Sequence, residues 1–444
     1  MKTMRAIRQT LAALGLALGL GAAWAAIPIE HWVHASGTRV YLVNSPSIPM
    51  VDVQMDFDGG SRREPADRAG LANATAGLLT GGVAAYEGQP ARDENALAAA
   101  WVDLGAQFDA SAGSDRFSVQ LRSLTDPAIL PRAVALAAQQ LARPTWPEAV
   151  WQRDRERSVA ALREALNRPS TVAGQAFGRA VYGDHPYGRF ATPETLAAIA
   201  VDDMRGFYRR HVTACRAQVV MVGAVDRAGA ERIVDALVRA IAPNGCAELS
   251  PVAEVKPLAA STEQRLPMAA AQAQVLMGQP GIKRDDPDFF PLLVGNHILG
   301  GSGFTSRLTQ EVREKRGLTY GVYSYFSPGR HAGAFQIGLS TRPDQADEAV
   351  RVVRETLARY VSDGPSEAEL QAAKDYLING FALRFDSNRK LLDNVVNIAW
   401  NGLPLDYLDT WTQRVRALSV DEVRRAMQRV VKPDRLATVV VGAK

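Results

Sequence analysis

The sequence is poor in cysteine and shows little excess of either charge. Cys215 and Cys246 are the two cysteines among 444 residues, and neither belongs to a CxxC motif or lies at a zinc-like spacing from a histidine. The formal net charge is +4, and it falls to about +1 if Lys2, Arg5 and Arg8 leave with a cleaved leader. No basic run with interleaved aromatic residues is present. These features do not indicate a nucleic-acid-binding protein.

Long hydrophobic runs are also absent from most of the chain. Beyond the N-terminus, no run approaches the ~20 apolar residues that a membrane-spanning helix needs. At the N-terminus, the three basic residues precede the apolar run Leu11–Leu20, and Ala23-Trp24-Ala25 follows as a small-x-small cleavage site. This order is typical of a secretory signal peptide over residues 1–25, with a buried N-terminal helix as the alternative. We therefore expect an exported, periplasmic protein without a membrane span, in which the two cysteines form either a disulfide or two buried thiols.

Several catalytic and nucleotide-binding motifs are missing. Gly300, Gly301 and Gly303 lack the GK[ST] of a phosphate-binding loop, and the intervening Ser302 is not in a GxSxG elbow. A catalytic zinc ion needs three protein ligands around an open position. The histidines show no such constellation: they are His31, His34, His185, His211, His297 and His331. We expect His185 to be a structural loop residue, and His211 and His297 to be satisfied residues within amphipathic helices.

An internal duplication organises the remaining chain. Val201–Ala224 aligns without a gap on Val420–Ala443, at an offset of 219 residues. Each copy contains an amphipathic helix, a turn and a β-branched strand that ends in Gly-Ala. The same offset maps Glu148 at one predicted helix start onto Glu367 at another. The chain is therefore predicted to contain two copies of one α/β unit.

Each copy groups its strands and helices in the same way. The predicted strands are 39–43, 51–57, 117–121, 272–277 and 333–340, and the predicted helices are 69–79, 147–167, 289–299 and one that begins after a Ser366/Glu369 capping box. This grouping predicts an α+β fold with two homologous α/β domains, each an antiparallel or mixed sheet with helices packed on it. The Pro- and Ser-bearing stretch 243–267 is predicted to link domain 26–242 to domain 268–444.

One stretch of the second copy, Ser306–Tyr325, places two polar residues at a helix-to-strand corner. Leu308 and Val312 lie one turn apart on the buried side of a predicted helix, which Gly317 ends in the left-handed conformation. A strand is predicted from Tyr320 onward. Such a corner can direct the guanidinium of Arg313 and the phenol of Tyr320 to one cavity. Alternatively, the arginine lies in solvent and the tyrosine in the core.

The segment GGSGFTSRLTQEVREKRGLTYGVYSYF resembles the signature of the second domain of the pitrilysin/insulinase peptidases, which include the mitochondrial processing peptidases. The resemblance extends over nearly the whole mature chain. It implies two domains that form a clamshell around a chamber. It also implies that Arg313 and Tyr320 bind the backbone of a substrate peptide near the scissile bond.

The first copy departs from the motif that active members of that family carry. In those members, HxxEH on a helix supplies two zinc ligands and the base that activates water, and a later Glu supplies the third ligand. Within the matching stretch Asp67–Gly82, the motif positions hold Asn73, Ala74, Thr75, Ala76 and Gly77. The position of the third ligand holds Ala161, or Asp154 or Glu164 in a shifted alignment. We therefore expect neither a metal ion nor a catalytic residue on this chain.

The resemblance implies a division of labour, because some members split catalysis between two chains. We predict a non-catalytic, substrate-binding subunit of an exported heterodimeric zinc metallopeptidase, inactive alone. Its partner carries HxxEH and zinc, and its substrate is an extended peptide. A stand-alone peptide-binding or chaperone-like module is the alternative, with the strand Phe117–Leu121 as a candidate free edge. A third possibility is an autonomous protease with unusual metal ligands.

Overall fold

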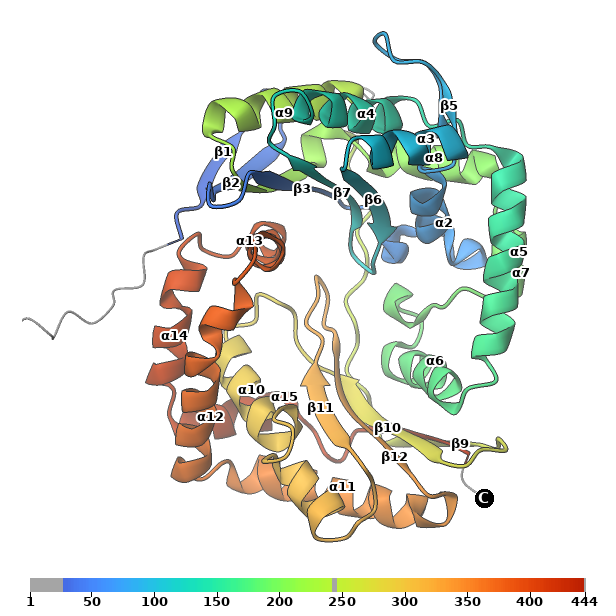
Figure 1. Cartoon of the computed structure of the whole chain (residues 1–444). Coiled ribbons are helices and arrows are strands. Elements are labelled where there is room, and N and C mark those ends of the chain that lie inside the picture. The colour runs from blue at the N-terminus through green and yellow to red at the C-terminus, as the bar shows by residue number, and fades with distance from the viewer. Residues whose placement is uncertain (1–26, 242–245, 443–444) are drawn as a thin grey trace, which may run out of the picture.

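The computed structural model describes residues 27–241 and 246–442 and shows two halves, each built on one β-sheet (Figure 1). The predicted signal peptide lies outside the described residues. The first sheet has the order β1-β2-β8-β3-β7-β6, with β2 and β8 parallel and the other neighbours antiparallel. Its strands are β1 (Glu30–Val33), β2 (Arg39–Asn44), β3 (Met50–Phe57), β6 (Gln107–Ala112), β7 (Phe117–Leu124) and β8 (Gln218–Gly223). A short separate hairpin pairs β4 (Gly82–Val83) with β5 (Arg92–Asp93).

The second sheet repeats this order with one strand fewer. It runs β11-β12-β10-β13-β9, and here β13 and β9 are the parallel pair. Its strands are β9 (Thr262–Leu266), β10 (Ala273–Pro280), β11 (Val322–Phe326), β12 (Ala334–Thr341) and β13 (Ala437–Val441). The matching strand order confirms the predicted duplication and the α+β fold class.

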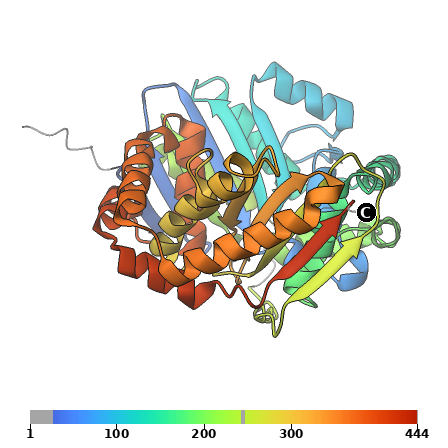
Figure 2. The same cartoon turned by 90° about the horizontal axis from the view of Figure 1, so that it is seen from below.

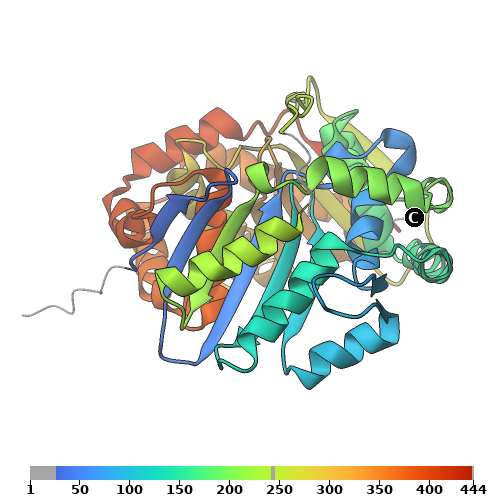
Figure 3. The same ribbon diagram turned by 90° about the horizontal axis from the view of Figure 1, so that it is seen from above.

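Helices cover the outer face of each sheet. In the first half, α4 and α9 pack together across the sheet, as Figure 3 shows from above. In the second half, α10, α11 and α15 lie across the outer face, and the long α11 is plain from below in Figure 2. The helices of the first half are α2 (Leu71–Leu78), α3 (Glu94–Asp103), α4 (Leu130–Ala142), α5 (Glu148–Ala165), α6 (Pro169–Tyr182), α7 (Pro193–Ala197), α8 (Val201–His211) and α9 (Arg227–Ala240). Those of the second are α10 (Phe289–Asn296), α11 (Ala346–Asp363), α12 (Glu367–Asn379), α13 (Asn388–Asn401), α14 (Tyr407–Ala417) and α15 (Val420–Val430). None of the helices described is long and apolar enough to cross a membrane.

Two helices cross reciprocally between the halves. The offset of 219 residues that relates α8 to α15 also relates α6 to α13. Helix α6 belongs to the first half by sequence, yet it packs on β10 and β13, where Phe177 joins a core with Leu276 and Val439. Helix α13 makes the reverse crossing and packs on β8 and β3, against a sheet face that includes Tyr41 and Val220 (Figure 1). The inner face of each sheet is therefore covered partly by the opposite half.

The structure differs from the sequence-based expectations in two strands. Strand β7 is hydrogen-bonded to both β3 and β6, so Phe117–Leu121 is not a free edge, and the prediction of an edge strand there is wrong. The predicted linker 243–267 contains strand β9 at its C-terminal end, because these residues pair with β13 at the edge of the second sheet. The Ser366/Glu369 capping box is confirmed. Cys215 and Cys246 form a disulfide, with Cα atoms 6.2 Å apart.

Candidate functional site

Arg313 lies on a helical segment that buried apolar residues hold in place. Residues Thr309–Glu314 form a π-helical turn, in which the Lys315 backbone N–H donates to the Gln310 carbonyl at 3.0 Å. Leu308 and Val312 are fully buried, as the sequence predicts. The turn ends close to Gly317, whose φ of +61° is the left-handed conformation expected there. A π-helical turn inside a helix widens one turn of backbone and is often found at functional sites.

Phe304 and Glu314 hold the guanidinium of Arg313 at the surface. Its Cζ lies 4.9 Å from the centroid of the Phe304 ring, and its Nε lies 3.4 Å from Glu314 Oε1. The Phe304 ring is itself 72% exposed. Stacking on an aromatic face orients the guanidinium while its other N–H groups remain available to a ligand. Sequence reasoning missed Phe304, although an aromatic residue in a glycine-rich loop before the helix is a visible signal.

Tyr320 lies in the loop before β11 and not on the strand. The Thr319 hydroxyl donates to the Ser340 carbonyl at 2.7 Å and accepts from the Gly321 N–H at 3.1 Å, so the strand begins only at Val322. The prediction of Tyr320 as a strand residue is therefore wrong. Its side chain is 88% exposed, and its hydroxyl makes no hydrogen bond within the described part of the chain. The phenol is thus free to donate to a bound molecule.

Helix α2 carries the positions at which active relatives would hold zinc. Asn73 and Gly77, the two positions of histidine ligands, lie on its exposed side, whereas Thr75 and Ala76 are buried. A Cβ built at Gly77 meets nothing within 4 Å, so nothing fills the space left by the missing side chain. The Thr75 hydroxyl donates a hydrogen bond to the Leu71 carbonyl at 2.7 Å. This set of side chains offers no imidazole or carboxylate and does not fit zinc.

The acidic residues that could replace the missing metal ligands of α2 are already hydrogen-bonded to other groups. The Glu64 carboxylate accepts from the backbone N–H groups of Gly70 and Ala72 at 2.9 and 2.6 Å, and so holds the start of the helix. Burial raises the pKa of Glu64 despite these bonds. On α5, Asp154 accepts from Arg153 at 2.9 Å, and Ala161 at the expected third position has no ligating atom. Within 27–241 and 246–442, no group of three His, Cys, Asp or Glu residues is placed to hold a metal ion.

Strand β11, which follows Tyr320, approaches the first half at its C-terminal end. The loop after β11 contacts the first half, where the backbone N–H of Arg330 donates to Asp115 at 3.0 Å and that of His331 donates to Tyr187 Oη at 3.2 Å. Tyr320 precedes the N-terminal end of this strand. Arg313 contacts Glu314 and Phe304, and within the described residues neither Arg313 nor Tyr320 makes a hydrogen bond, ion pair or ring contact with α2.

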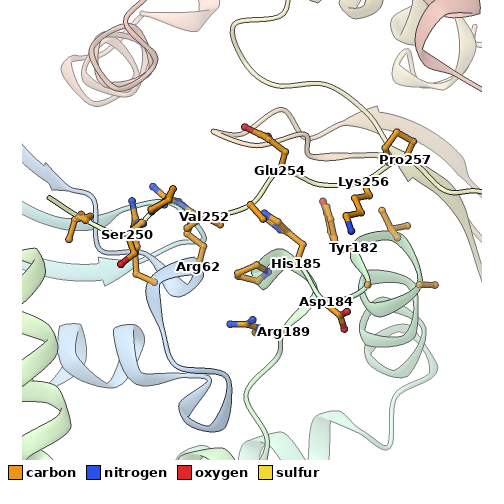
Figure 4. A pocket seen from close by; sticks show the side chains of 18 of the residues that line it. Arg62, Tyr182, Asp184, His185, Arg189, Ser250, Val252, Glu254, Lys256 and Pro257 are labelled. Atoms are coloured by element: carbon orange, nitrogen blue, oxygen red, sulfur yellow. The ribbon is translucent and has the colours of Figure 1, made fainter.

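A separate cavity of about 740 Å³ lies between the first half and the linker segment Leu249–Ala259 (Figure 4). His185 lines it and is 7% exposed, with its Nδ1 accepting from the Tyr187 N–H at 3.1 Å. The rings of His185 and His331 lie 5.1 Å apart, and His331 Nδ1 lies 3.1 Å from Glu254. Burial lowers the pKa of His185. Its capping bond and ring contacts are those expected of a structural loop histidine.

His211 is also structural, as predicted. Its Nδ1–H donates to the Asp58 carbonyl at 3.0 Å, and its ring packs against Phe207. Burial lowers its pKa to about 4.

Comparisons with known proteins agree with this architecture. Residues 39–191 match the family model described as insulinase (peptidase family M16), and residues 198–377 match the model described as peptidase M16 inactive domain. A crystal structure described as a peptidase M16 inactive domain from Pseudomonas fluorescens is 31% identical, with a TM-score of 0.87 over 94% of this chain and 98% of that chain. The chain belongs to the peptidase M16 family.

Two M16 relatives carry different descriptions. A protein of Streptomyces coelicolor described as an uncharacterized zinc protease is 28% identical over 91% of this chain and 88% of that protein. A Helicobacter pylori protein described as a non-peptidase homologue is 24% identical over 89% of this chain and 90% of that protein. Because α2 lacks the HxxEH residues, this chain is an inactive M16-like peptidase homologue.

A further solved structure shares the fold of this chain at low sequence identity. The Escherichia coli protein described as the periplasmic protease PqqL has a TM-score of 0.78 at 17% identity. The alignment covers 96% of this chain and 46% of that one.

Proposed function

We propose that this chain is the non-catalytic, substrate-binding subunit of an exported heterodimeric zinc metallopeptidase. The observation that carries this proposal is the contrast between its two halves. The first half has no zinc-binding side chain at the motif positions of α2, whereas the second half presents Arg313 and an 88% exposed Tyr320 on the surface. A partner subunit with an HxxEH helix would supply the zinc ion and the base.

In that complex, Tyr320 donates its hydroxyl to the scissile carbonyl oxygen, on which negative charge develops in the transition state. Arg313, held on Phe304, donates to a neighbouring backbone carbonyl and sets the register of the extended peptide. The arrangement needs no metal ligand on this chain. The proposed location is the periplasm, supported by the leader-like residues 1–25 and by a fold shared with a protein described as periplasmic.

Replacement of Tyr320 tests this role. In a complex reconstituted with the HxxEH-bearing subunit, Tyr320→Phe should lower kcat roughly a hundredfold, because one preorganised donor to the developing charge is worth about 3 kcal/mol. The dissociation constant of the two subunits should not change, since only a hydroxyl is removed from an exposed ring. Tyr376→Phe is the matched control, because it removes a hydroxyl from another exposed tyrosine, which stacks on His297. Unchanged peptide cleavage by the Tyr320→Phe complex would refute the assignment.

A further inference from the structure

The second half contains another cavity, of about 400 Å³, between α10, α13, α14 and the C-terminal end of β11. Aromatic and aliphatic side chains form most of its wall: Ile282, Phe289, Leu292, Leu293, Tyr325, Phe326, Pro328, Phe381, Tyr407, Leu408 and Trp411. Three asparagines, Asn296, Asn394 and Asn397, add amide groups. The charged residues of the wall are Arg284 and Arg384, and it contains no acidic residue. The size and the apolar lining with few polar groups are those of a small-molecule or side-chain pocket.

Arg284 is buried, and its side chain packs among aromatic rings. The residue is 8% exposed, its Nη2 donates to Tyr407 Oη at 2.8 Å, and its Cζ lies 3.8 Å from the centroid of the Phe289 ring. Its backbone N–H donates to the Gly329 carbonyl at 2.9 Å, which fixes the chain at this point. In the part of the chain that the structure describes, no carboxylate forms an ion pair with Arg284. A guanidinium has five N–H donors, so most of its hydrogen-bonding capacity is left for a ligand.

Arg384 reinforces the positive charge of the same wall. Its Cζ lies 5.0 Å from the Trp411 ring centroid, and its carbonyl accepts from Asn394 Nδ2 at 3.0 Å. Asp286 and Asp288, close to Arg284 in the sequence, do not neutralise the charge of the cavity wall, because both form ion pairs with Arg429. Arg384 is exposed, whereas Arg284 is buried, and a buried charge without a counter-ion is costly. A ligand that carries a negative charge would offset this cost. Two arginines with planar donor forks suit a carboxylate, which accepts two parallel hydrogen bonds.

We propose that this cavity binds the terminal carboxylate of a molecule with a large apolar side chain, of which the C-terminal residue of a peptide is the fitting class. Arg284 and Arg384 receive the carboxylate, and the aromatic wall receives the side chain. Pro328 and Asn397 also line a cavity of about 520 Å³ between β7 and α13, so the two spaces adjoin. A chain end in the second of these cavities would therefore lie next to the carboxylate pocket. This site is separate from Arg313 and Tyr320 and goes beyond the proposed function.

Calorimetric titration of the whole chain with two matched probes tests the proposal. N-acetyl-L-phenylalanine should bind at least about tenfold more tightly than N-acetyl-L-phenylalaninamide, because the amide removes the charge but keeps the ring. Arg384→Gln should weaken binding of the acid about tenfold and leave binding of the amide unchanged. Arg416→Gln, which removes an exposed arginine on α14, is the matched control and should bind the acid like the unmodified chain. Arg284→Gln repeats the test in the buried position, with its folding checked by thermal unfolding.

A pentapeptide that ends in phenylalanine, compared with its C-terminally amidated form, separates the two sources of the carboxylate. Preference for the free acid in the peptide pair assigns the pocket to chain ends, and preference only in the small-molecule pair assigns it to small acids. Equal affinity for acid and amide in both pairs, or no saturable binding of the acid at millimolar concentration, would overturn the proposal. Because the readout is binding without hydrolysis, it is independent of the outcome of the Tyr320→Phe experiment.

Discussion

At the scale of single residues, we expect the buried His211 to make the fold sensitive to acid. His211 is buried and donates through Nδ1 to the Asp58 carbonyl, and burial lowers its pKa to about 4 from an ordinary value of 6.5. The native state therefore stays neutral at His211 while the unfolded chain takes up a proton below pH 6.5. The unfolded state then binds more protons, so stability falls as the pH falls. The contribution of neutral His211 to the free energy of unfolding is complete above pH 6.5 and is lost as the pH falls from 6.5 to 4.

His211→Asn should remove this part of the acid sensitivity. The Asn amide retains an N–H donor for Asp58 but does not titrate, so the loss of unfolding free energy between pH 7.5 and pH 5.0 should be smaller by about 2 kcal/mol. Urea denaturation at pH 7.5 and pH 5.0 measures the change in unfolding free energy for the variant and for the unmodified protein. An identical pH dependence in the variant and the unmodified protein would show that His211 does not carry this linkage.

The residue pattern predicted the anchors of the candidate site better than the site itself. Leu308, Val312 and Gly317 are determined by local rules, helical spacing and the left-handed end of a helix, and they lie where the sequence indicated. The position of Tyr320 depends on Thr319, whose bonds to Ser340 and Gly321 delay the start of β11. A bond to a residue 21 positions away is not visible in a local pattern. The assignment of Arg313 and Tyr320 to substrate binding stays a prediction.

At the scale of elements, the crossing helices α6 and α13 tie the halves together. Phe177 on α6 is almost fully buried and contacts Gly278 of β10, where a built Cβ would lie 2.9 Å from the ring. The same Cβ would lie 2.0 Å from the Phe335 carbonyl oxygen of β12, so a side chain at position 278 would displace both the neighbouring strand and α6. The glycine allows helix and sheet to approach closely, as expected for glycine in a strand interior.

Phe177→Ala should lower the free energy of unfolding by about 3–5 kcal/mol, because it leaves a cavity between the helix and the sheet. Phe304→Ala removes the same ring from an exposed position and should cost far less. Thermal or denaturant unfolding of the two variants compares them directly. Similar stability losses in both would contradict the crossing of α6 onto the second sheet.

Short-range patterns located most elements, and long-range pairing accounts for the differences. The strands β2, β3, β10 and β12 and the helices α2, α5 and α12 lie close to their predicted ranges. Neither the pairing of β6 beside β7 nor the addition of β9 to the second sheet follows from periodicity, because neighbours in a sheet are set by tertiary structure. The exchange of α6 and α13 between the halves is invisible for the same reason.

At the scale of the whole molecule, each half covers part of the inner sheet face of the other through α6 and α13. Without the second half, the first sheet loses α13 from Tyr41, Val43, Val220 and Val222, and α6 loses its sheet. Exposed apolar surface of this kind destabilises a domain and promotes aggregation.

We expect residues 26–242 expressed alone to show no cooperative thermal transition, and the same for residues 246–444. Co-expression of the two fragments should restore a complex that melts cooperatively, because α6 and α13 can then each pack on the sheet of the other fragment. Circular dichroism and size-exclusion chromatography measure these outcomes. A cooperative transition in either isolated half would show that the crossing is dispensable.

In the proposed complex, this chain contributes substrate contacts and no hydrolytic chemistry. The decisive measurement is peptide hydrolysis by the pure chain, by an exported HxxEH-bearing chain encoded in an adjacent reading frame, and by their mixture. We expect no cleavage by this chain alone, and chelator-sensitive cleavage by the mixture that exceeds that of the partner alone. Chelator-sensitive cleavage by this chain without any partner would refute the proposed role.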